Sequence, residues 1–91
     1  MAQVVVILKV MPTGTDIDLK HIEKSAVSEI TKFGGNFAKS EVKPVAFSLN
    51  SLLLYFIMEE SIGSTEALES TISKIEGVNS VDVIDVRRTV G

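Results

Sequence analysis

Cysteine is absent from this sequence of 91 residues. The chain therefore has no disulfide framework, no thiolate ligand for a metal and no cysteine nucleophile. Small secreted domains commonly depend on disulfide bonds, so the composition argues against an extracellular protein of that kind. We expect the protein to be cytoplasmic.

Long hydrophobic segments are also lacking. The longest uninterrupted apolar run is Leu52–Met58, whereas a helix that crosses a bilayer needs about 20 apolar residues. The sequence passes from Met1 almost directly into the apolar residues 4–8, without the basic region and small-residue cleavage site of a signal peptide. We therefore expect neither a membrane span nor a signal peptide, and we interpret the first apolar run as a β-strand.

Positive charge is scarce, because 9 lysine and arginine residues stand against 12 acidic residues, for a net charge of −3. Proteins that bind nucleic acid need a basic face to meet the phosphates. The charge therefore favours a protein partner or a small ligand over direct binding of nucleic acid.

Hydrophobic residues, by contrast, make up 45% of the chain. This length and this content suffice for one hydrophobic core, and we expect residues 1–91 to form a single domain. The β-branched run Val4–Val10, ended by the turn residues 11–14, predicts a first strand. After it, apolar residues recur at the spacing of one helical face, at Leu19, Ile22, Ala26, Ile30 and Phe33.

The ends of the first helix carry recognisable signals. Asp16 or Asp18 is expected to cap its start, because a carboxylate there accepts hydrogen bonds from unpaired backbone N–H groups. Residues 34–36, Gly-Gly-Asn, are expected to end it. Residues 39–49 then predict a second strand, in which Pro44 favours an edge position or a bulge.

The remaining residues predict a hairpin, a second helix and a last strand. Asn50–Ser51 is predicted to form the hairpin turn into a third strand, residues 52–58. A loop over residues 59–63 leads to a helix that Ser64 or Thr65 caps and Gly77 ends, with Leu68, Ile72 and Ile75 facing inward. Residues 78–86 predict the last strand, and residues 87–91 a tail.

The resulting order, β-α-β-β-α-β, is the split βαβ arrangement of ferredoxin-like α+β domains. Its two right-handed crossovers place both helices on one face of a four-stranded antiparallel sheet. The other face carries no helix, and it is where such domains usually meet a partner.

Residues that carry catalytic or metal chemistry are sparse. His21 is the single histidine, and it lies beside the apolar stripe of the first helix without evident partners, so we interpret it as a solvated surface residue. Capping and solubility explain the paired acids Asp16/Asp18, Glu59/Glu60 and Asp82/Asp85. The glycines at 34–35 and 63 lack the pattern of a phosphate-binding loop. We therefore expect no enzyme, no metal and no cofactor.

Two features call for a functional interpretation. Phe47 shares a strand face with Val45 and Leu49, so it is either a core residue or an exposed anchor for a pocket in a partner. Arg87 and Arg88 are the only adjacent cations. They are either solvated residues of a tail or guanidinium groups that reach carboxylates or phosphates of a partner.

Four segments give the sequence a family resemblance. It resembles archaeal elongation factor 1-beta, a guanine-nucleotide exchange domain family, in VILKVMP (residues 6–12), PVAFSL (44–49), GSTEALE (63–69) and IEGVNSVDVIDVRR (75–88). The resemblance runs essentially from end to end.

This resemblance implies an exchange factor that releases GDP from the GTPase elongation factor 1-alpha so that GTP can load. It also implies that Phe47 enters a pocket of the GTPase. Arg88, with Arg87 as its neighbour, would reach the Mg²⁺ and phosphate region. The eukaryotic branch has lysine where this chain has Arg88, and a planar guanidinium differs from an ammonium in geometry.

An alternative from another class is a regulatory domain of the same topology that senses a small ligand. An RNA-recognition domain also shares the topology, but it stacks bases on aromatic residues of its central strands. Here Val5, Ile7 and residues 83–86 supply no such platform.

Overall fold

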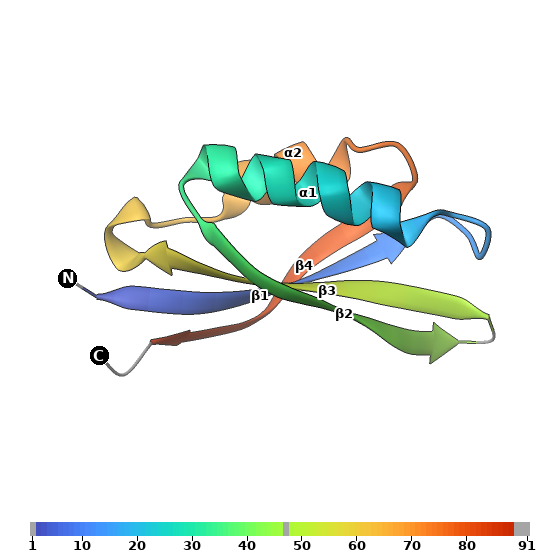
Figure 1. Ribbon diagram of the computed structural model, residues 1–91, viewed down its shortest axis with the longest axis horizontal. Helices are drawn as coiled ribbons and strands as arrows, with labels where there is room; N and C mark the ends of the chain where they lie inside the picture. The colour runs from blue at the N-terminus through green and yellow to red at the C-terminus, as the bar shows by residue number, and fades with distance from the viewer. Residues whose placement is uncertain (1, 47, 89–91) are drawn as a thin grey trace.

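The computed structural model describes residues 2–46 and 48–88. In chain order, the elements are β1 (Gln3–Pro12), α1 (Leu19–Phe33), β2 (Asn36–Ala46), β3 (Leu49–Glu59), the short 3-10 helix η1 (Glu60–Ile62), α2 (Glu66–Ser73) and β4 (Val78–Arg88). The strands form one antiparallel sheet in the order β2-β3-β1-β4. Both helices lie on the same side of this sheet (Figure 1), which confirms the predicted ferredoxin-like α+β fold.

The core lies between the helices and the two central strands, β1 and β3. Alternate residues of β1 are buried, and they pair with buried residues of β3, as Val6 does with Phe56 and Leu8 with Leu54. Side chains of a strand alternate between its two faces, so the other set of residues lies on the helix-free face. Each fully buried large apolar side chain contributes roughly 1.5–3 kcal/mol through its removal from water.

Helix α1 follows its predicted pattern. Ile22, Ala26 and Ile30 are fully buried. The carboxylate of Asp18 accepts a hydrogen bond from the backbone N–H of Lys20 at 3.0 Å, so Asp18 rather than Asp16 caps the helix. Gly34 ends it in a left-handed conformation, with φ of 107°, which a residue without Cβ adopts at little cost.

The β2–β3 hairpin differs from the prediction. Asn50 pairs with Pro44, and Ser51 pairs with Lys43, so both residues belong to β3 and the predicted turn at Asn50–Ser51 is wrong. The turn lies between Ala46 and Leu49, where Ser48 has a positive φ of 58°. Ladder pairing outweighs the local turn preference of Asn-Ser. As predicted, β2 is an edge strand with a register shift after Pro44.

The second half ends differently from the prediction as well. Helix α2 stops at Ser73, and Gly77, with φ of 96°, lies in the turn before β4 instead of ending the helix. Leu68 and Ile72 are buried as expected. Strand β4 continues beyond the predicted end at Val86, because Arg87 pairs with Val5 and Arg88 with Val4 of β1.

Candidate functional site

The two arginines at the end of β4 belong to the sheet and not to a tail. Neighbouring residues of a strand point to opposite faces. Arg88 pairs with Val4, a buried residue of the helix-covered face, whereas Arg87 pairs with Val5 of the helix-free face. The sheet therefore separates the two guanidinium groups, and only that of Arg88 lies on the side of η1.

Arg88 is held by an acidic residue of the loop that follows β3. Its Nη2 atom donates a hydrogen bond to Oε1 of Glu60 at 2.7 Å. Glu60 is itself placed by its backbone N–H, which donates to the carbonyl of Ala2 at 3.0 Å. The hydrogen bond to Glu60, with its charge, raises the pKa of the Arg88 guanidinium, which therefore keeps its positive charge throughout the physiological pH range.

This ion pair is accessible to solvent, since the Arg88 side chain is 74% exposed. Exposed ion pairs are screened by water and contribute little to stability. Glu60 therefore orients the guanidinium without burying it, and a carboxylate or phosphate of a partner can replace it. Arg87 forms a separate exposed pair with Asp85, from Nε to Oδ2 at 2.6 Å.

The predicted site residue Phe47 lies outside the described residues, so the choice between core and exposed anchor stays a prediction. The residues around it are placed. The β2–β3 turn lies beyond the pair Val10–Leu52, whereas Arg88 lies beside Val4 at the other end of β1. Figure 1 shows this turn and the end of β4 at opposite ends of the molecule, whose longest dimension is 41 Å.

A polar cluster on the helix-free face was missed by sequence reasoning. Tyr55 on β3 pairs with Lys39 on β2, whose ammonium nitrogen lies 4.7 Å from the ring centroid. A hydrogen bond from Tyr55, aided by Lys39, lowers the pKa of Glu41, and the same bond raises the pKa of Tyr55. Tyr55 is the single tyrosine and lies in the longest apolar run. Its neighbours in the sequence are apolar, so the sequence gives no sign of the polar residues that β2 places beside it.

The remaining candidates do not form a chemical site. Among residues 2–46 and 48–88, no group of three or more His, Asp or Glu side chains is placed to hold a metal ion. His21 is exposed, as predicted. Within the same residues, no helix is long and apolar enough to cross a membrane.

Comparisons with known proteins agree with this architecture. Residues 5–89 match the family described as the EF-1 guanine nucleotide exchange domain. Elongation factor 1-beta of Methanobrevibacter smithii is 40% identical over 88 residues, covering 97% of this chain and 98% of that protein. The protein of the same name from Staphylothermus marinus is 40% identical over 89 residues, with the same coverage of each chain.

Solved structures agree on the fold alone. The C-terminal domain of the MgtC protein from Mycobacterium tuberculosis superposes with a TM-score of 0.63 at 14% identity, over 97% of this chain and 88% of that one. The family match does not favour the alternative of a ligand-sensing regulatory domain. From its sequence over nearly its whole length, this chain belongs to the EF-1 guanine nucleotide exchange domain family.

Proposed function

We propose that this chain is a guanine-nucleotide exchange factor that promotes GDP release and GTP loading on elongation factor 1-alpha during translation elongation in the cytoplasm. The observation that carries this proposal is the family match over residues 5–89. Residues 1–91 would act as one exchange-factor domain, without nucleic acid or membrane as a direct partner. No covalent bond forms or breaks in such an exchange, so the chain would not be an enzyme.

The physical basis of exchange is a competition for the contacts that hold GDP. GTPases bind the nucleotide through Mg²⁺ and through donors around its phosphates. The exposed guanidinium of Arg88 has the charge and the planar donors to engage carboxylates or phosphates there. Because binding free energies are reciprocal, a factor that weakens GDP binding is itself bound less tightly when GDP is present.

The two predicted binding elements would have different tasks. Ala46 and Leu49, the described strand residues nearest to residue 47 in the sequence, and the strand end that carries Arg88 lie at opposite ends of the sheet. We therefore assign Phe47 to affinity for the GTPase and Arg88 to disturbance of the nucleotide site. Arg87, on the other face of the sheet, would support the same interface.

The test is the rate at which fluorescent GDP leaves elongation factor 1-alpha at increasing concentrations of this chain. We expect Arg88→Ala to lower the maximal rate and Phe47→Ala to raise the concentration needed for half of it. The variant His21→Ala, on an exposed position of α1, serves as the control. No acceleration by the unaltered chain would refute the proposed function, and acceleration that neither variant changes would refute the assigned residues.

A further inference from the structure

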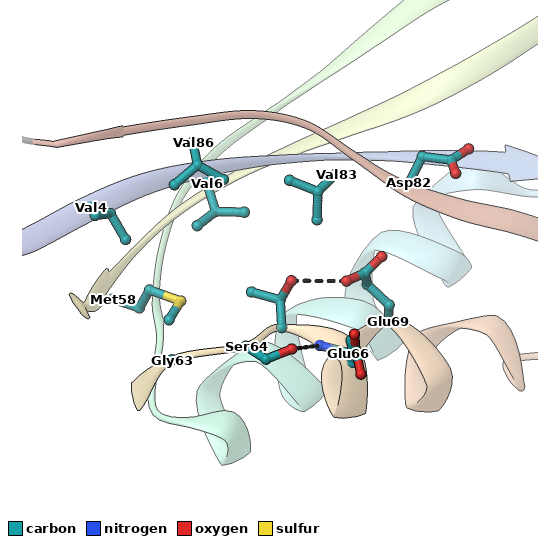
Figure 2. A pocket seen from close by; sticks show the side chains of 11 residues that line it. Val4, Val6, Met58, Gly63, Ser64, Glu66, Glu69, Asp82, Val83 and Val86 are labelled. Atoms are coloured by element: carbon teal, nitrogen blue, oxygen red, sulfur yellow. Dashed lines mark hydrogen bonds between the residues drawn. The ribbon is translucent and has the colours of Figure 1, made fainter. Parts of the chain in front are cut away.

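An open groove lies between the start of α2 and the strands β1 and β4 (Figure 2). Its volume is about 540 Å³. Val4, Val6 and Met58 of the central strands line it together with Val83 and Val86 of β4. Val86 belongs to the helix-covered face, because it pairs with the buried Val6, yet it is 54% exposed. Helix α2 therefore stops short of this part of the sheet and leaves Val86 open to a partner, whereas Val4, Val6 and Met58 are buried or nearly so.

The side chains that α2 contributes to the border of this apolar surface are acidic. Glu66 and Glu69 of α2 border the groove, and none of the described residues that line it is basic. Asp82 of β4 also lines it, but Asp82 pairs with Lys9 of the helix-free face, so its carboxylate lies on the other side of the sheet. Glu69 is half-buried, and its Oε2 atom accepts a hydrogen bond from Oγ1 of Thr65 at 2.8 Å. Figure 2 shows Glu69 near one end of the groove and Val4, Val86 and Met58 near the other.

This combination selects one kind of side chain. A long alkyl stem packs favourably on valine and methionine while its charged head stays in water, where a carboxylate at the far end attracts it. Lysine and arginine have both parts. An anionic ligand is disfavoured, since the backbone N–H of Glu66 is already satisfied by Oγ of Ser64 at 3.1 Å and the nearby carboxylates repel negative charge.

We propose that this groove receives a lysine or arginine side chain on an aliphatic segment of a partner protein, with its stem on Val4 and Val86 and its head at Glu69. The identification of this partner as the GTPase rests on the proposed function. It is supported by the position of the groove, because Val4 pairs with Arg88. A partner that engages Arg88 is therefore already next to the groove.

The first test uses the isolated chain and the peptide acetyl-Leu-Val-Lys-Val-Leu-amide, observed through methyl NMR signals. We expect saturable shifts at Val4, Val86 and Met58. A peptide with norleucine in place of lysine has a similar stem without the charge, and we expect it to bind about fivefold more weakly. The substitution Glu69→Gln should weaken the lysine peptide by a similar factor, whereas Glu76→Gln, which removes the same charge at an exposed position away from the groove, should not.

Absence of shifts at these methyl groups would overturn the inference, as would equal affinity for the lysine and norleucine peptides. If butylamine alone bound as tightly as the lysine peptide, the ligand would be a small amine, and the inference of a protein partner would also be overturned. These outcomes do not depend on the exchange assay, so they separate failure of the groove from failure of the proposed function.

The second test uses the GTPase. We expect Glu69→Gln to raise the concentration for half-maximal GDP release about fivefold, without lowering the maximal rate, relative to Glu76→Gln. If the unaltered chain accelerates release and the two variants behave alike, the groove has no role in binding the GTPase, while the proposed function stands.

Discussion

The connection between α1 and β2 offers a sharp test of the packing described above. Gly35 is buried, and its backbone N–H donates to the carbonyl of Ile30 at 2.9 Å. A Cβ atom at this position would lie 2.9 Å from Cδ2 of Phe56 and 3.0 Å from Cγ2 of Ile30. Both neighbouring side chains are fully buried, so neither can move aside without disturbing the core.

The expected cost of Gly35→Ala follows from two opposing effects. Overpacking of a well-packed core costs about 1–3 kcal/mol. Alanine also reduces the conformational entropy of the unfolded chain relative to glycine, which raises the free energy of unfolding by about 0.4–1 kcal/mol. We therefore expect the free energy of unfolding to fall by roughly 1–2 kcal/mol, which for a small domain lowers the urea midpoint by about 0.5–1 M.

The assay is urea unfolding followed by circular dichroism, with Gly14→Ala as the matched control. At Gly14, the nearest atom to an added Cβ is Oδ1 of Asp16 at 3.2 Å, the end of an exposed side chain that can rotate away. We expect that control to stay within about 0.5 kcal/mol of the unaltered chain. Equal midpoints for the two variants would refute the close approach of Gly35 to Phe56.

Three further predictions concern single contacts. The substitution Glu60→Gln removes the charge that holds Arg88, so the maximal rate of GDP release should rise about twofold; a lower maximal rate would show instead that Glu60 positions the guanidinium for its action on the nucleotide site. Loss of the helix cap in Asp18→Ala should lower the free energy of unfolding by about 1 kcal/mol, measured by thermal denaturation, and an unchanged midpoint would contradict the cap. In Tyr55→Phe, the pKa of Glu41 should rise toward its ordinary value of 4.5, as followed by the carboxyl carbon signal of Glu41. An unchanged titration of Glu41 in this variant would refute the hydrogen bond. Because folding lowers the pKa of Glu41, the stability that this bond contributes is present above the unfolded-state pKa and is lost as pH falls through the folded-state pKa.

The sequence predicted most of the fold because the patterns that determine it are local. The three-and-four spacing of Ile22, Ala26 and Ile30 identifies the buried face of α1 without knowledge of what covers it. The hairpin turn was misplaced because Asn50 and Ser51 are common turn residues, and only their pairing with β2 shows that they belong to a strand. Register between strands is not a local property.

The candidate site was predictable only in part, for a related reason. Arg88 stands out as one of two adjacent cations, but Glu60 lies 28 positions earlier in the chain, and no spacing rule connects them. Similarly, the valines of the groove appear in the sequence as ordinary core residues. Among them, Val86 is 54% exposed, because α2 does not extend over this part of the sheet face.

The irregularity in the pairing of β1 with β4 determines which arginine faces η1. Leu8 pairs with Val83, but Ile7 pairs with Asp85, so Ile84 is an extra residue in β4. If the first register continued without this bulge, Arg87 rather than Arg88 would oppose Val4. A single β-bulge thus determines to which face of the sheet each later side chain of the strand points. During evolution, one residue inserted between Asp85 and Arg87 would place Arg87 opposite Val4 and turn Arg88 to the helix-free face, whereas loss of Ile84 together with the bulge would leave both arginines in place.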